Sequence, residues 1–298
     1  MHKYLILALL LVANSLVVTA GAPKAADSAR LSAVLEAQVD KRKARYQWRH
    51  PQETLAFFGI TPGMTVVEVL PGGGWYSSIL VSYLGSEGVL IGADYPMEMW
   101  PNFPFGNDEF IAKRRAWIEE WPQRAAQWKG DDGASGRAVR IGMIPDDMDG
   151  TVDAVLFIRA LHNLSRFENK GGFLSGALAD SLAVLKPGGL VGVVQHMAPA
   201  GRSHEWADGS RGYLNQSTLI ARFETAGFEY LGSSDINLNP ADVPAEDEVV
   251  WRLPPSLQTS NNNPELTAKY EAIGESNRMT LLFRKPLKRK PAAGLLGN

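Results

Sequence analysis

The stretch that decides the fold is TVVEVLPGGGWY at Thr65–Tyr76, which is followed by IGADYP at Ile91–Pro96. The first stretch is an apolar run with one acid near its end, Glu68, and it passes directly into three consecutive glycines. A second apolar run stops at Asp94, about twenty residues after the glycines. A strand, a glycine loop, a helix and a second strand that ends in an acid are typical of the first half of a parallel α/β sheet.

Further alternation of strand-like and helix-like segments follows along the chain. Strands are predicted at 65–70, 89–93, 138–142, 153–158, 190–195, 228–236 and 279–284, and the main helices at 25–43, 51–58, 76–83, 171–185 and 217–226. This order predicts a mostly parallel sheet with helices on both faces. Because ligands of such sheets bind at the carboxyl ends of the strands, the glycine loop is the expected cofactor seat.

The composition limits the classes of function. The chain has 298 residues, of which 45% are hydrophobic, and this is enough for one large α/β domain with its own core. The net charge of −2 argues against a nucleic-acid partner and leaves a small-molecule substrate open. The chain has no Cys, which excludes disulfides, thiolate metal sites, a Cys nucleophile and a lipoprotein anchor. Nothing in the sequence indicates an oligomeric state.

The N-terminal residues have the pattern of a secretory signal. An apolar run at Tyr4–Val18 is followed by the small-residue site Val18-Thr19-Ala20. We therefore expect a signal peptide at 1–20, a helical lead-in at 21–50, and a periplasmic or secreted protein with no stable membrane insertion after cleavage. The alternative is an uncleaved membrane anchor, because the run, about seventeen residues when Thr19 and Ala20 are included, is at the short limit for spanning a bilayer. A basic, disordered tail is predicted at 287–298.

Two cofactors fit the glycine loop. A dinucleotide prefers G-x-G-x-x-G, and Gly72-x-Gly74-x-x-Ser77 matches it imperfectly. S-adenosylmethionine (SAM) instead needs an acid near the glycines for its α-amino group and a second acid for its ribose hydroxyls. Glu68 and Asp94 fit those two roles, although each acid could also only cap a turn or a helix. The predicted cofactor-binding residues are Glu68, Gly72, Gly73, Gly74 and Asp94.

These motifs resemble those of class I SAM-dependent methyltransferases, and more narrowly those of a group of exported bacterial proteins labelled predicted methyltransferases. The resemblance is carried by 68–76 (EVLPGGGWY), Asp94, 153–157 (DAVLF), 185–189 (LKPGG) and the late pair of strands. It implies a methyltransferase-like domain at 51–286 with a Rossmann-like, seven-stranded, mostly parallel sheet whose last strand is antiparallel. It also implies SAM as cofactor and methyl transfer to a small molecule. The alternatives are a non-catalytic exported ligand-binding protein with the same fold and, less favoured, a nicotinamide oxidoreductase.

The chain departs from that family pattern at two places. Leu70 stands where the first glycine of E/D-x-G-x-G-x-G is expected. After the third strand, where the family often has an acid for the adenine amino group, the chain has Ile141-Gly142-Met143, and the nearest acids are Asp146 and Asp147. The residue that contacts adenine is therefore not identified by the sequence.

Two histidines follow neighbouring strands of the implied sheet. His162 lies in RALHNL after the fourth strand, and His196 ends the fifth strand in VVQHM. An imidazole can accept a proton from a nucleophile near neutral pH, so both are candidate catalytic residues, although each could also only hydrogen-bond a loop. The candidate substrate contacts are Asn163, His204 and Tyr213. No metal site is expected, because the histidines lack the spacing of metal ligands.

Overall fold

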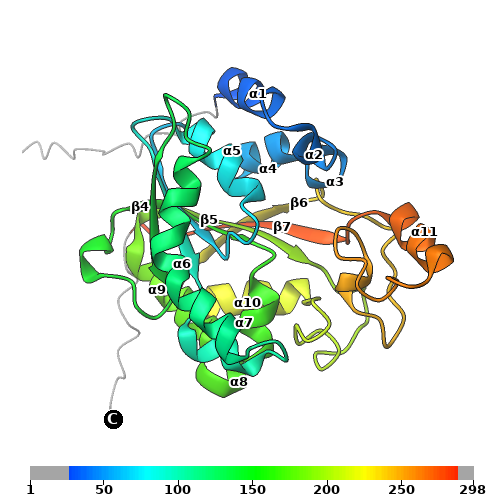
Figure 1. Cartoon of the computed structure of the whole chain (residues 1–298). Helices are drawn as coiled ribbons and strands as arrows, with labels where there is room; N and C mark the ends of the chain where they lie inside the picture. Colours follow the sequence, from blue (N-terminus) through cyan, green and yellow to red (C-terminus); the bar gives the residue numbers. More distant parts are fainter. Residues whose placement is uncertain (1–26, 288–298) are drawn as a thin grey trace, which may run out of the picture.

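The computed structural model describes residues 27–287 (Figure 1). The predicted signal peptide at 1–20 and all but the first residue of the predicted tail at 287–298 lie outside the described residues, so both stay predictions. Among the described residues, no helix combines the length and the apolar character needed to cross a bilayer.

A single seven-stranded sheet organises the described residues, with the strand order β3-β2-β1-β4-β5-β7-β6. The strands are β1 (Thr65–Val69), β2 (Val89–Asp94), β3 (Ser135–Arg140), β4 (Val152–Ile158), β5 (Leu185–His196), β6 (Glu229–Ser234) and β7 (Arg278–Arg284). The first five strands pair in parallel, and β7 is antiparallel to both of its neighbours, β5 and β6. The predicted Rossmann-like α/β fold with an antiparallel last strand is confirmed.

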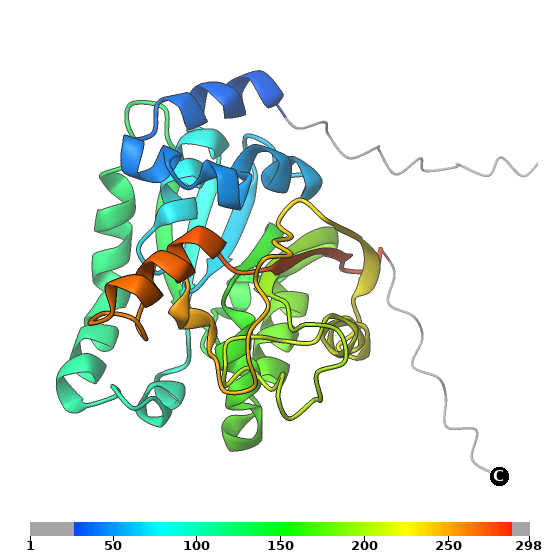
Figure 2. The same cartoon turned by 90° about the vertical axis from the view of Figure 1, so that its right-hand side faces the viewer.

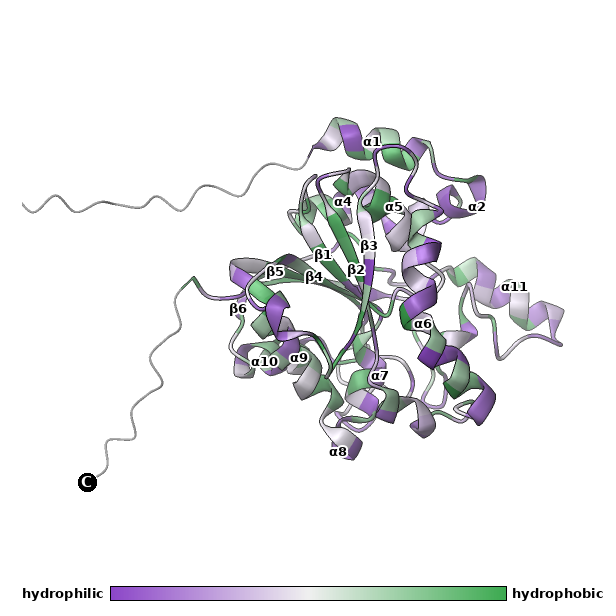
Figure 3. Ribbon diagram, turned by 60° about the vertical axis from the view of Figure 1, so that its left-hand side comes forward, coloured by the Kyte–Doolittle hydropathy of each residue, from purple (hydrophilic) through white to green (hydrophobic). Residues whose placement is uncertain are grey.

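Helices cover both faces of this sheet (Figures 1 and 3). One face carries α4 (Pro51–Phe57), α5 (Trp75–Leu84) and α6 (Asp108–Ala126), and the other carries α7 (Leu161–Arg166), α9 (Phe173–Val184) and α10 (Gln216–Thr225). Successive side chains of β1 serve the two cores in turn: Val66 packs against the first set of helices, and Val67 packs against the second. The central strands β1, β2 and β4 are accordingly mostly apolar along their length, as buried parallel strands are.

The lead-in predicted as one helix at 25–43 is divided into shorter helices. The structure has α1 (Ser28–Glu36), α2 (Asp40–Lys43) and α3 (Tyr46–Arg49). The Asp27 side chain accepts a hydrogen bond from the Arg30 amide at the start of α1. α3 ends at His50, whose φ of 38° is left-handed, and Pro51 begins α4. The chain turns at this link instead of continuing the helix, and Arg49 at the end of α3 lines the same cavity as Gly72 and Gly73.

The connection between β6 and β7 contains structure that the sequence pattern did not predict. It includes a 3₁₀ turn at Val250–Arg252 and the helix α11 (Pro264–Ile273). Asn263 caps α11 through its side chain, and Pro264 occupies the first helical position, so a start signal was present. α11, drawn in orange, lies in front of the carboxyl edge of the sheet and below the blue N-terminal helices (Figure 2).

β5 begins five residues earlier than the strand predicted at 190–195. β5 already begins at Leu185, which pairs with Val152, and the next paired residue is Leu190, opposite Ala154. The intervening residues therefore form a bulge within the strand rather than a turn before it. Gly188 has a φ of 82°, a left-handed value that glycine adopts without penalty.

Candidate functional site

A cavity of about 710 Å³ opens at the carboxyl ends of β1, β4 and β5, a size typical of small-molecule sites. One wall is the loop after β1 together with the first residues after β4. A second wall comes from residues 39–49 of the N-terminal helices, and a third comes from residues 250–256 and 275–276 of the β6–β7 connection. The cavity therefore joins segments from both ends of the described chain.

Glu68 contributes its carboxylate to the cavity wall from the end of β1. The side chain is buried, and the Ser77 hydroxyl on α5 donates a hydrogen bond of 2.6 Å to its Oε2. Burial raises the pKa of Glu68 to about 7, while Ser77 and the positive charge of Arg159 act in the opposite direction. Glu68 is thus a buried acid held in place beside the glycine loop, ready to pair with a cation.

The glycine loop turns sharply between β1 and α5. Leu70 has a φ of 51°, Gly72 of 55° and Gly74 of 75°, so three residues of the loop are left-handed. Leu70, which replaces the expected first glycine, adopts the left-handed conformation in spite of its side chain, at a cost of about 1–2 kcal/mol. The left-handed conformation at this position is therefore adopted without a glycine.

The three glycines have different surroundings. Gly72 and Gly73 line the cavity, and an added Cβ at Gly73 would meet nothing within 4 Å. Gly74 does not line the cavity; a Cβ there would lie 2.0 Å from the Trp128 ring. Gly74 is thus required by the packing of Trp128 onto the start of α5, whereas the other two leave room for a ligand.

Asp94 lies at the end of β2 but does not line this cavity. Its carboxylate is fully buried, and Oδ2 lies 3.1 Å from Arg114 Nε and 3.2 Å from Arg140 Nη1, while Oδ1 forms an ion pair with Arg114. Its predicted contact with ribose hydroxyls stays a prediction, and in this structure the partners of the carboxylate are two arginines. The adenine region that the sequence left open, residues 141–147, likewise does not line the cavity.

His162 is buried in the cavity wall just after β4. The Gln195 side chain donates from Nε2 to the Gly212 carbonyl at 3.0 Å, which turns its Oε1 toward His162 Nδ1 at 3.4 Å. Because an amide oxygen only accepts, Nδ1 of His162 carries the hydrogen and Nε2 keeps its lone pair. Burial lowers the pKa of His162 to about 4, so the imidazole is neutral at pH 7.

His196 ends β5 next to His162, and their ring centroids are 5.4 Å apart. Its Nδ1 lies 2.6 Å from the hydroxyl of Ser276, which lies two residues before β7. Burial, with His162 as the next cause, holds the pKa of His196 well below its usual value. The two imidazoles lie side by side in the cavity wall, because β4 and β5 are adjacent strands; their catalytic role stays a prediction.

The three candidate substrate contacts are separated in space. Asn163 lines the main cavity beside His162. His204 lines a different cavity of about 390 Å³, where its Nδ1 lies 3.1 Å from the Thr218 hydroxyl. Tyr213 is fully buried, and its hydroxyl is hydrogen-bonded to Asp242 and to Arg252. Tyr213 thus supports the wall behind His196 through its ring, at a centroid distance of 6.3 Å.

Within residues 27–287, no His, Asp or Glu side chains are grouped so as to hold a metal ion.

Sequence reasoning missed six charged residues of the cavity: Lys41, Arg42, Arg45, Arg49, Arg159 and Glu275. The sequence DKRKARYQWR at 40–49 carried the signal, but a run of charges usually marks a solvated surface. Glu275 reaches the site because β7 is antiparallel: it begins with Arg278 opposite His196, the last residue of β5. The segment before β7 therefore enters at the edge where the parallel strands end.

No protein-family profile and no curated protein matches this sequence. Among solved structures, a SAM-dependent methyltransferase from Aquifex aeolicus is 19% identical, with 70% of this chain and 93% of that chain covered and a TM-score of 0.45. A geranyl diphosphate methyltransferase in complex with GPP and sinefungin is 15% identical, with coverages of 80% and 77% and a TM-score of 0.48. The [4+2]-cyclase SpnF is 16% identical, with coverages of 80% and 81% and a TM-score of 0.44. At such values the likeness concerns the fold and carries no argument about the reaction.

Proposed function

We propose that this chain is a SAM-dependent methyltransferase that acts on a small-molecule acceptor. The observation that carries the proposal is the position of the buried Glu68 carboxylate beside Gly72 and Gly73 in one wall of a cavity that His162 and His196 also line. An acid and a glycine loop at the end of the first strand would hold the cofactor, and candidate bases at the ends of β4 and β5 line the same cavity.

The residues present fit the methionine end of SAM. Glu68 would hold the α-amino group, and Gly72 and Gly73, which lack side chains, would let the ligand approach the backbone. Bound SAM supplies a methyl group that its sulfonium already makes electrophilic. At the ribose end, Asp94 is paired with arginines outside the cavity wall, so it has no part in this proposal.

The chain contributes alignment, exclusion of water and a proton acceptor. Alignment of the acceptor in the cavity can contribute about 7–11 kcal/mol, whereas a general base adds a factor of about 10²–10⁴. His162 is the better placed base, because its protonated Nδ1 leaves the Nε2 lone pair to take a proton from the acceptor. Its pKa of about 4 keeps the imidazole neutral at pH 7 but also makes it a weak base, so alignment of the acceptor is the larger contribution.

Calorimetric titration of the full chain with SAM and, in parallel, with NAD tests the proposal. We expect SAM to bind, Glu68→Ala to weaken it, and Glu53→Ala, an exposed acid on α4, to leave it unchanged. No SAM binding at millimolar concentration would refute the methyltransferase function, and preferential binding of NAD would favour an oxidoreductase.

We also propose that the chain is exported and belongs to the exported bacterial group that its motifs resemble. The support is the apolar run at Tyr4–Val18 followed by the small residues Val18-Thr19-Ala20. N-terminal sequencing of the protein from its native cells tests this: a start at Gly21 supports export with cleavage. A start at Met1 or His2 in the membrane fraction would instead indicate an uncleaved anchor.

A further inference from the structure

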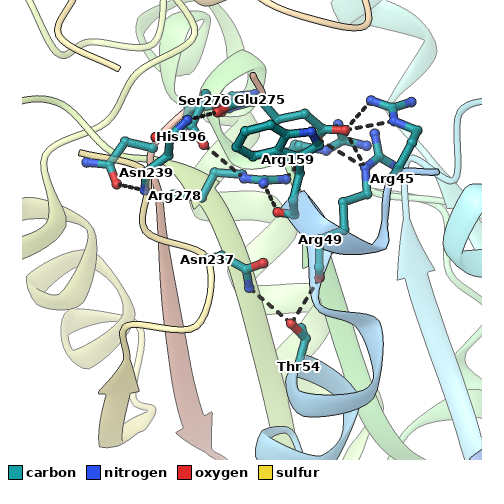
Figure 4. A network of polar contacts seen from close by, with 12 residues as sticks. Arg45, Arg49, Thr54, Arg159, His196, Asn237, Asn239, Glu275, Ser276 and Arg278 are labelled. Atoms are coloured by element: carbon teal, nitrogen blue, oxygen red, sulfur yellow. Dashed lines mark hydrogen bonds and ion pairs between the residues drawn. The ribbon is translucent and has the colours of Figure 1, made fainter. Parts of the chain in front are cut away.

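Four arginines gather around one buried carboxylate in the wall of the main cavity (Figure 4). Glu275 is only 4% exposed at its side chain. Its Oε1 lies 2.5 Å from Arg45 Nη2 and 3.0 Å from Arg49 Nε, and its Oε2 lies 3.0 Å from Arg278 Nη1 and 3.9 Å from Arg159 Nη1. We call these four arginines and Glu275 the arginine cluster.

The arginine cluster has a surplus of positive charge. Four guanidinium groups share a single carboxylate, although buried charges are normally paired because an unpaired one costs several kcal/mol. Burial lowers the pKa of Arg49 to about 9 and that of Arg159 to about 10, and both values leave the side chains charged at neutral pH. Lys41 and Arg42 line the same cavity and add to the excess, so the cavity attracts anions.

Two of the arginines, Arg49 and Arg159, have guanidinium N–H groups without a hydrogen-bond acceptor in the described part of the chain. Arg49 is 2% exposed and lines the cavity, yet its Nη1 has no hydrogen-bond partner. The Arg49 guanidinium lies over the Trp75 ring, 4.5 Å from its centroid, and this contact holds the side chain in position. The Tyr76 hydroxyl donates a hydrogen bond of 3.2 Å to the backbone carbonyl of Arg49. A rigid, buried and unsatisfied donor at a cavity wall indicates a ligand that supplies the acceptor.

Arg159 presents its guanidinium from the end of β4. In the described part of the chain, its only ion pair is the long one to Glu275, at 3.9 Å. Its backbone φ is 59°, a left-handed value that costs an L-residue about 1–2 kcal/mol and that the loop nevertheless maintains. Strain of this kind persists where the structure needs a side chain at one particular place.

We propose that the arginine cluster binds an anionic group, a carboxylate or a phosphate, of the methyl acceptor, with Arg49 and Arg159 as its hydrogen-bond donors. That the bound anion belongs to a methyl acceptor rests on the proposed methyltransferase function, whereas the existence of an anion site does not. Bidentate donation by arginine suits the planar or tetrahedral oxygens of such groups. The adjacent His196 would then face an acceptor anchored by its charge, and His162 lies next to it.

SAM carries a carboxylate of its own, so the experiment has to distinguish an anionic group of the cofactor from an anionic group of the acceptor. Inorganic phosphate serves as the probe, titrated into the full chain by calorimetry, first alone and then with saturating S-adenosylhomocysteine. The variants are Arg49→Gln and Arg159→Gln. The matched control is Arg137→Gln, an exposed arginine on the distant edge strand β3.

We expect phosphate to bind the wild-type chain, and each cluster variant to weaken it about tenfold, a loss of about 1.4 kcal/mol. The control should match the wild type. Circular dichroism of each variant checks folding; should Arg49→Gln fail to fold because Glu275 loses a close partner, Arg159→Gln, with its long ion pair, carries the test. Equal phosphate affinity in wild type and folded Arg159→Gln overturns the proposal, as does no phosphate binding to the wild type.

Phosphate and S-adenosylhomocysteine should bind at the same time if the anion belongs to the acceptor. Mutual exclusion, together with weaker S-adenosylhomocysteine binding in the cluster variants, would assign the arginines to the carboxylate of the cofactor and overturn the proposal. Phosphate binding without any S-adenosylhomocysteine binding would refute the methyltransferase function but support the anion site. The two proposals therefore fail in different ways.

Discussion

Replacing Glu68 by Gln should stabilise the folded protein at alkaline pH. The size of this effect follows from the shift that burial causes in the pKa of Glu68. The pKa of Glu68 is raised from 4.5 to about 7 by burial. An acid with a raised pKa in the folded state contributes most stability when protonated, below pH 4.5, and that contribution is lost as the pH rises through 7. Each pH unit corresponds to about 1.4 kcal/mol, so keeping the charged carboxylate buried at pH 8 costs about 3 kcal/mol.

Gln has nearly the same shape as the protonated acid but never ionises. Its side-chain oxygen can still accept the hydrogen bond that Ser77 donates at 2.6 Å. The free energy of unfolding of Glu68→Gln minus that of the wild type should therefore grow by about 3 kcal/mol between pH 4.5 and pH 8. Comparing this difference at two pH values cancels any effect of the substitution that does not depend on pH.

Urea unfolding followed by tryptophan fluorescence provides the assay, since the chain has eight Trp residues. Glu53→Gln, at an exposed position on α4, is the control and should show no such growth, because its side chain stays in water in both states. A difference for Glu68→Gln that stays constant with pH, or that shrinks as the pH rises, would refute the burial argument. The same variant should bind SAM more weakly, because an amide cannot pair with the α-amino group as a carboxylate does.

Three further changes test other parts of the site. The wild type should lose about 3 kcal/mol of stability as the pH falls from 6.5 to 4, because the folded protein resists protonation of this buried imidazole, and His162→Gln should remove that loss. Urea unfolding at pH 7 and at pH 4 measures the difference. Gly74→Ala should destabilise the chain by about 2 kcal/mol, because the Cβ would lie 2.0 Å from the Trp128 ring, while Gly73→Ala should be close to neutral in thermal unfolding. Arg159→Gly should raise stability by about 1 kcal/mol by relieving the left-handed backbone, and should weaken phosphate binding in calorimetry.

Each of these has an outcome that contradicts its reasoning. A pH profile of His162→Gln parallel to that of the wild type would mean that the imidazole is not protected from protonation. Equal effects of the two glycine substitutions would show that Trp128 moves freely. Loss of stability in Arg159→Gly would mean that the long ion pair with Glu275 outweighs the backbone strain.

Much of the fold could be read from the sequence because it depends on local patterns. The apolar runs of β1, β2, β4 and β7, separated by helices, predicted a mostly parallel sheet, and adjacency of β4 and β5 brought His162 and His196 together as expected. The β6–β7 connection was harder to predict, since the short helix α11 depends on one cap and one proline within a region rich in turn residues. The position of β5 also changed, because the pairing of Leu185 with Val152 belongs to the sheet and leaves no local signal.

The sequence by itself determined the order of strands and helices along the chain and the glycine loop that follows Glu68, because neighbouring residues form each of them. It also placed His162 and His196 directly after or at the end of predicted strands, and the pairing of β4 with β5 then brought the two rings together. Only the tertiary structure decided which charges meet. It paired Asp94 with Arg114 and Arg140. It also placed Arg49 beside Glu275, which lies 226 residues away in the sequence. Side-chain pairing across such separations depends on how the antiparallel β7 and the N-terminal helices pack at one edge of the sheet, and no spacing within the sequence records that.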